Sequence, residues 1–142
     1  MKQVFADTGY WIALIDPKDQ LHDKAKSVSI GLQPVIIVTS EMVLVEFANF
    51  FSDKGAKFRK TVVNVINSIR NDPNTKLIHQ TSNQFQSALT TYNTHADKAW
   101  SLTDCASIQI MREQSIQEVL AHDQHFAQAG FKALLRESCR VS

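Results

Sequence analysis

Short apolar runs alternate with longer segments of helical periodicity along this chain, and this alternation is the feature that most constrains its fold. Continuous apolar runs are typical of buried strands, and the run at residues 34–40 is also rich in β-branched residues and bounded by Pro34 and by Thr39-Ser40. We expect strands at residues 2–7 (KQVFAD), 34–40 (PVIIVTS), 76–80 (KLIHQ), 118–123 (EVLAHD) and 131–136 (FKALLR).

The segments between these runs carry apolar residues at the three- and four-residue spacing of helices. Helices are expected at residues 8–15, 16–32, 41–55, 56–72, 82–97 and 101–114. Asp16-Pro17 is read as the start of the second of these, with Gly31 near its end, and Gly55 as the end of the third. Strands separated by helices predict an α/β fold, a three-layer α/β/α sandwich around a mostly parallel five-stranded sheet.

Composition limits the possible classes of protein. The 142 residues, 44% hydrophobic and 20% charged, predict one soluble globular domain spanning residues 1–142. No apolar run approaches the roughly 18 residues needed to cross a bilayer, and the N-terminus lacks a signal-like apolar region, so we expect no membrane contact and a cytoplasmic location. The two cysteines, Cys105 and Cys139, form no C-x-x-C motif, which argues against a disulfide framework or a thiolate zinc site.

Acidic residues follow two of the expected strands. Asp7 comes directly after the residues VFA of the first, and Asp123 directly after the residues VLAH of the fourth. In parallel α/β sheets, ligands gather outside the carboxyl ends of the strands. Asp104, at the head of an expected helix, is a further acid of interest.

Glu46 is the acid that its surroundings explain least. It stands within MVLVEFANFF, where a carboxylate is costly unless it is paired, hydrogen-bonded or bound to a metal. Glu41, by contrast, is at the helix start, where the helix dipole explains an acid.

Each acid also has a structural interpretation. Asp7 and Asp123 could cap the helices that follow them, and Ser101 with Asp104 has the spacing of a capping box. Glu46 could pair with an Arg or Lys. Taken together, four acids at one edge would repel one another, and a hard cation such as Mg²⁺ or Mn²⁺ would relieve that repulsion.

The chain resembles the PIN-domain ribonucleases of the small VapC-like toxin type over nearly its whole length. The resemblance is carried by FADTGYWIAL, VTSEMVLVEFANFF, DKAWSLTDCASIQIM and LAHDQHFAQAGFKAL. These segments match the family's four acidic positions with Asp7, Glu46 (not Glu41), Asp104 and Asp123.

The resemblance implies metal-dependent endonucleolytic cleavage of RNA, a homodimer and, for a toxin, a small antitoxin partner. Asp7, Glu46, Asp104 and Asp123 would be the catalytic and metal-binding residues for Mg²⁺ or Mn²⁺. Asp7 and Asp104 would bind the metal directly, and Glu46 and Asp123 through waters or at a second metal. Thr8 and Thr103 would orient waters or, more simply, cap helices.

Other features admit two interpretations. Lys54, Lys57, Arg59 and Lys60 surround Phe58 and would either track an RNA backbone or form a solvated helix face, and Lys98 is a second candidate for phosphate contact. Trp11 is expected in the core, although Tyr10 and Trp11 could also stack a base. His122 and His125 flank Asp123, but no cysteine or third nearby histidine completes a tetrahedral zinc site.

Two alternative functions remain open at this stage. One is a non-catalytic PIN-like module that binds RNA or a protein. The other is a receiver-like signalling domain that uses one Asp as a phosphoacceptor, although that fold gathers a pair of acids after its first strand and ADTG offers one.

Overall fold

The computed structural model describes residues 1–136, which form five strands and seven helices. The strands are β1 (Gln3–Ala6), β2 (Ile36–Ser40), β3 (Thr75–Ile78), β4 (Glu118–Leu120) and β5 (Lys132–Ala133). The helices are α1 (Thr8–Ile15), α2 (His22–Leu32), α3 (Glu41–Phe50), α4 (Ala56–Asn71), α5 (Ser82–Thr94), α6 (Leu102–Glu113) and α7 (Gln124–Gln128).

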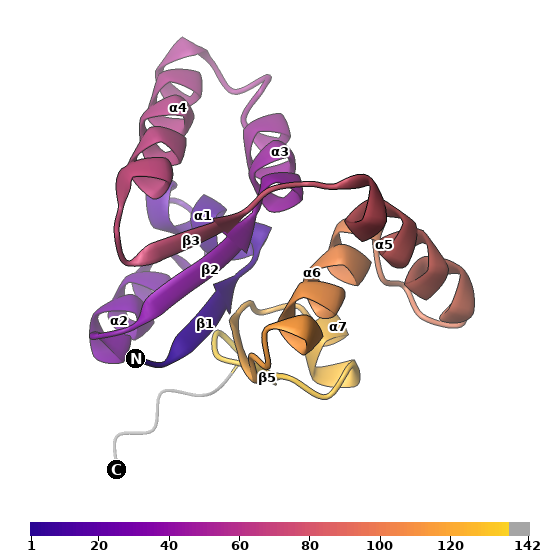
Figure 1. Ribbon diagram of the computed structural model, residues 1–142. Helices are drawn as coiled ribbons and strands as arrows, with labels where there is room; N and C mark the ends of the chain where they lie inside the picture. The colour runs from indigo at the N-terminus through magenta and orange to yellow at the C-terminus, as the bar shows by residue number, and fades with distance from the viewer. Residues whose placement is uncertain (137–142) are drawn as a thin grey trace.

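The five strands form one parallel sheet in the order β3-β2-β1-β4-β5 (Figure 1). Helices α1, α2 and α4 lie on one side of the sheet, and α5, α6 and α7 on the other (Figure 1). This arrangement confirms the predicted α/β/α sandwich. None of the helices within residues 1–136 combines the length and apolar character that a membrane crossing requires.

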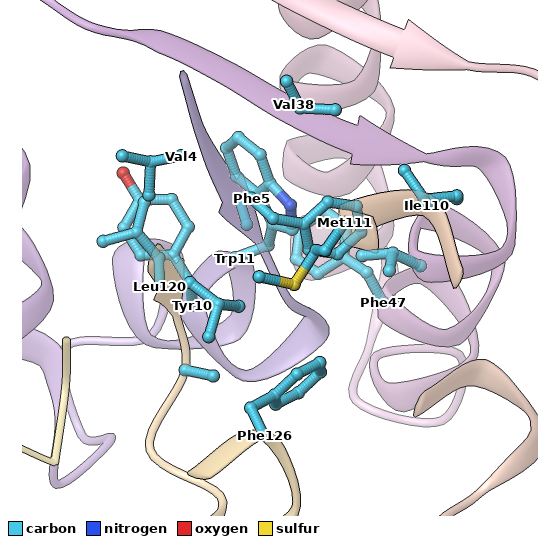
Figure 2. Packing of buried hydrophobic residues seen from close by; sticks show 14 of the residues in the cluster. Val4, Phe5, Tyr10, Trp11, Val38, Phe47, Ile110, Met111, Leu120 and Phe126 are labelled. Carbon is cyan, nitrogen blue, oxygen red and sulfur yellow. The ribbon is translucent and has the colours of Figure 1, made fainter. Parts of the chain in front are cut away.

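The core is built around β1, the middle strand of the sheet. Val4, Phe5 and Ala6 are completely buried, because helices cover both faces of this strand. Figure 2 shows the surrounding side chains, which come from both helical layers and include Trp11 of α1 and Met111 of α6. Such burial fixes the end of β1, and therefore the start of the segment that carries Asp7.

Hydrogen bonds hold the carboxyl ends of the three central strands together. The backbone N–H of Asp7 donates to the carbonyl of Leu120 at the end of β4 (3.2 Å). On the other side, the Thr39 hydroxyl of β2 donates to the carbonyl of Ala6 (2.9 Å). The chain turns from β1 toward β2 on one side and reaches β4 on the other, so Asp7 lies at the point where ligands bind in open α/β sheets.

Two predicted boundaries are wrong for local reasons. The helix expected from Asp16 begins at His22, because the carboxylates of Asp16 and Asp19 accept hydrogen bonds from the backbone two residues on and so form turns. The helix expected to end at Gly55 ends at Phe50. Gly55 is instead the N-cap of α4 and has a φ of 99°, a conformation that favours glycine.

The remaining boundaries agree with the expectations to within a few residues, except that the last strand is short. The expected strand at 131–136 contains only the two residues of β5. The short helix α7 follows Asp123, as the capping interpretation of that residue requires. Cys139 lies outside the described residues, whereas Cys105 is fully buried.

Candidate active site

The four predicted acids come from four places in the chain and meet at the carboxyl edge of β1 and β4. Asp7 follows β1, Glu46 lies on α3, Asp104 lies in the first turn of α6, and Asp123 precedes α7. Asp7 and Asp104 are buried, with exposed fractions of 9% and 8%. The carboxylates of Asp104, Glu46 and Asp123 are all close enough to Asp7 to raise its pKa.

Asp7 is the acid of the cluster whose pKa is clearly raised. It is in the N-cap position of α1, but its side chain accepts no capping hydrogen bond, so the capping interpretation is wrong for this residue. Burial raises the pKa of Asp7 from 3.8 to about 7, a hydrogen bond from the backbone of Thr8 opposes the rise, and the three neighbouring carboxylates add to it. The site therefore holds a carboxylate whose negative charge lacks compensation.

Glu46 is half-buried and is oriented by a hydroxyl group. The Thr8 hydroxyl donates to its Oε1 at 2.6 Å, which links the start of α1 to the middle of α3. The Thr8 hydroxyl therefore orients the Glu46 carboxylate, a contact that the sequence analysis did not predict. No ion pair within residues 1–136 involves Glu46, so the pairing with Arg or Lys is not observed in that part of the chain.

Glu41, the other acid of α3, has a structural role. Its carboxylate accepts a hydrogen bond from the backbone N–H of Gln80 (2.7 Å), and its second oxygen lies 3.4 Å from Nδ1 of His79. The hydrogen bond from the Gln80 backbone is the main cause that lowers the pKa of Glu41 below its usual value, and the nearby His79 lowers it further. Glu41 therefore ties α3 to the segment between β3 and α5, away from the acidic cluster.

Asp104 forms the capping box that its spacing with Ser101 predicts. The Ser101 hydroxyl accepts from the Asp104 N–H, and Asp104 Oδ2 accepts from the Ser101 N–H, both at 3.0 Å. The same Oδ2 lies 2.7 Å from Nδ1 of His125. Asp104 therefore has a structural role that coexists with its position in the cluster.

Asp123 is a helix cap as well. Its Oδ1 accepts a hydrogen bond from the His125 backbone N–H (3.2 Å), and its side chain is about half exposed. The same Oδ1 lies 3.1 Å from Nδ1 of His125. One imidazole nitrogen thus contacts both Asp104 and Asp123.

His125 is the residue of this site whose role the sequence analysis missed. It was considered there only as a zinc ligand. The useful signal in the sequence is that His125 follows Asp123 by two residues, which is the spacing at which an N-cap side chain accepts a backbone N–H. The contact with Asp104, 21 residues earlier, depends on the packing of α7 against α6 and has no local signal.

The oxygen ligands of the cluster fit a hard divalent cation, although the carboxylates are not arranged as a complete metal site. An all-carboxylate set suits Mg²⁺ or Mn²⁺. Burial is the main cause of the raised pKa of Asp7, and the neighbouring carboxylates add a repulsion that such a cation would relieve. Within residues 1–136, however, no three His, Cys, Asp or Glu side chains stand so that they could hold a metal ion as they are. Thr8 holds Glu46, and Ser101 and His125 hold Asp104, so these two carboxylates already have fixed hydrogen-bond partners.

The other sequence candidates lie outside the acidic cluster or in the core. Trp11 is buried, and its indole N–H points to the Thr39 hydroxyl (3.3 Å), while the buried Tyr10 donates to Ser29. Neither ring is free to stack a base. Cys105 is a fully buried core residue. Its burial is the main cause that raises the pKa of its thiol, and the Asp104 carboxylate adds to the rise.

The basic run at the start of α4 is exposed to solvent. Arg59 donates to the carbonyl of Ser52 (3.0 Å), and the Lys54 ammonium lies 4.5 Å from the centre of the Phe50 ring. These contacts are local to the α3–α4 turn. They are compatible with either interpretation of the run, an RNA contact or a solvated helix face.

Comparison with known proteins finds similar sequences and structures that cover about nine-tenths of the chain. No family model matches the chain. The 23S rRNA-specific endonuclease VapC20 of Mycobacterium tuberculosis is 29% identical over 128 residues, which cover 90% of this chain and 95% of the relative. The crystal structure of VapC20, a sarcin-ricin loop cleaving toxin, superimposes with a TM-score of 0.81 at 27% identity over 90% of this chain and 95% of that one. FitAcB of Neisseria gonorrhoeae, at 14% identity and a TM-score of 0.61, shares the fold over 92% of this chain and 95% of its own.

Proposed function

Because this chain resembles the VapC-like PIN-domain ribonucleases in sequence and in fold, we propose that it is a toxin-type endoribonuclease that hydrolyses RNA phosphodiester bonds at its acidic cluster. The observation that carries this proposal is the buried Asp7 carboxylate, raised in pKa and surrounded by three more acids at the ligand-binding edge of the sheet. A purely structural role would not keep this charge uncompensated.

In this proposal the reaction depends on Mg²⁺ or Mn²⁺ held by Asp7, Glu46, Asp104 and Asp123. Once bound, the metal supplies the positive charge that allows a phosphodiester to approach the acids and that polarises water. The chain's own residues orient the carboxylates: Thr8 holds Glu46, and His125 together with the capping box of Ser101 holds Asp104.

The partners follow from the same proposal. The substrate is RNA, and an antitoxin protein would inhibit the chain by covering the acidic cluster, with an Arg or Lys placed between the carboxylates. We also propose that the chain forms a homodimer, which light scattering at several concentrations would test, and that it acts in the cytoplasm, where its RNA substrate is found.

The activity is tested by incubating the purified chain with an RNA stem-loop in Mg²⁺, in Mn²⁺ and in EDTA. We expect cleavage with either metal, no cleavage in EDTA, and no cleavage by Asp7→Asn or Asp104→Asn. Glu41→Gln is the matched control, since it neutralises an acid of α3 that is bound to Gln80 rather than to the cluster. Intact RNA in all conditions, together with unchanged RNA binding by Asp7→Asn, would instead indicate a non-catalytic binding module.

A further inference from the structure

A cavity of about 400 Å³ opens between the last turn of α5 and the segment that leads into α6. It is lined by Tyr92, Asn93, Ala96, Lys98, Ala99 and Trp100. A volume of this size is in the range of small-molecule sites. Of these residues the sequence analysis singled out only Lys98, and the proposed chemistry at the four acids uses none of them.

One wall of the cavity is rigid. Trp100 is 6% exposed, its ring lies 4.7 Å from that of His95, and its indole N–H donates to Gln128 Oε1 on α7 (3.0 Å). These contacts fix Trp100 from two sides, so a ligand that enters the cavity meets a preformed surface.

Other residues that line the cavity present groups that are free to bind. The Tyr92 side chain is 53% exposed, and neither its ring nor the Asn93 side-chain amide has a hydrogen bond or ring contact in the part of the chain that the structure describes. The Lys98 ammonium lies 3.5 Å from its exposed neighbour Asp97, a surface pair that a phosphate can displace at little cost.

The cavity is next to the acidic cluster along the chain. Trp100 is followed by Ser101, whose backbone N–H donates to Asp104 Oδ2 at 3.0 Å. Trp100 also contacts α7, the helix that Asp123 caps. Trp100 thus connects the cavity, through Ser101 and through α7, to the elements that carry Asp104 and Asp123.

We propose that the cavity is a nucleobase subsite, which binds one unpaired base of the RNA beside the cleaved bond. The base stacks on Tyr92, the Asn93 amide hydrogen-bonds to its edge, and Lys98 pairs with a backbone phosphate. Aromatic stacking and amide contacts are the usual means of reading unpaired bases. The identity of the ligand as RNA rests on the proposed function, but base binding itself does not require cleavage.

The test uses AMP as the probe and the two tryptophan indole N–H resonances as the readout. In ¹⁵N-labelled protein in EDTA, AMP should shift the Trp100 indole resonance. The Trp11 indole resonance should not change, because Trp11 does not line the cavity and its indole N–H is hydrogen-bonded to Thr39 on β2. Ribose 5-phosphate, which lacks the base, should bind about tenfold more weakly, given the ~1–3 kcal/mol that stacking contributes per base. Equal binding of the two ligands would overturn the proposal in favour of a simple anion site.

Three variants complete the test. Tyr92→Ala should weaken AMP binding about tenfold and Tyr92→Phe by less than about twofold, because the ring is what stacks. Phe85→Ala is the matched control, since it removes an exposed aromatic of the same helix that does not line the cavity. Unchanged AMP affinity in Tyr92→Ala, or no Trp100 shift at all, would refute the subsite. AMP binding without RNA cleavage would refute only the nuclease.

Discussion

The two sides of the acidic cluster differ in how well their carboxylates are compensated. On the Asp7–Glu46 side, Asp7 has a backbone hydrogen bond from Thr8 but no capping bond, its pKa is still raised by burial, and Glu46 has one hydroxyl donor. On the Asp104–Asp123 side, both carboxylates accept backbone N–H groups and share the His125 imidazole.

This difference shows that capping a helix and serving a reactive site are compatible for the same acid. The Asp104–Asp123 side is stable as it stands, and its acids are fixed in place before any ligand arrives. The Asp7–Glu46 side carries the electrostatic cost. Loss of charge should therefore have opposite effects on stability at the two sides, although it should impair cleavage at both.

The largest effect is expected at Asp7. Its folded-state pKa of about 7 exceeds the usual 3.8, so above pH 7 its ionised form costs folding free energy. In metal-free protein at pH 8, Asp7→Asn should raise the free energy of unfolding by on the order of 2–4 kcal/mol. The gain should shrink as the pH falls below 7 and nearly vanish at pH 4, where the folded protein already binds the proton. Urea unfolding in EDTA measures this, and a gain that does not depend on pH would contradict it.

Asp104→Asn should have the opposite sign. The substitution removes the carboxylate charge that accepts hydrogen bonds at the N-terminus of α6 and contacts Nδ1 of His125, so the free energy of unfolding at pH 7 should fall by about 1 kcal/mol. The same urea experiment provides the measurement. If Asp104→Asn stabilised the protein as Asp7→Asn is expected to, the two sides would not differ as described.

His125 should matter through the position of the two acids that it contacts. His125→Ala should weaken Mn²⁺ binding by about tenfold, which is the usual cost of losing a group that orients metal ligands. His125→Asn, whose amide can replace Nδ1, should recover part of that loss. Isothermal titration calorimetry with Mn²⁺ measures the affinity of each variant. Equal Mn²⁺ affinities for His125→Ala and the wild type would exclude the positioning role.

The smallest effect is expected at Thr8. Thr8→Val keeps the shape of the side chain but removes the hydroxyl that orients Glu46, at a cost of about 1 kcal/mol or a few-fold in cleavage rate. Thr8→Ser should cleave like the wild type. Cleavage rates at saturating Mn²⁺ provide the comparison, and a Thr8→Ser variant as slow as Thr8→Val would show that the methyl group is what matters.

The sequence alone predicts the sheet and the meeting of the acids, because Asp7 and Asp123 each follow a buried strand and parallel strands end at one edge. It does not predict the contacts that orient these acids. Thr8 and Glu46 are 38 residues apart, and their hydrogen bond depends on how α1 packs against α3. The late start of α2 was also missed, because the hydrophobic pattern does not reveal the turns at Asp16 and Asp19.

The strand order has a consequence for protein synthesis. Because β1 is made first and its neighbour β4 is made more than a hundred residues later, a growing chain cannot assemble the cluster until Asp123 and α7 have left the ribosome. A nascent chain that ends before β4 carries Asp7, Glu46 and Asp104 but lacks the strand end that places the fourth acid. For a chain proposed to cut RNA, this order would delay activity until β4 and α7 have emerged from the ribosome.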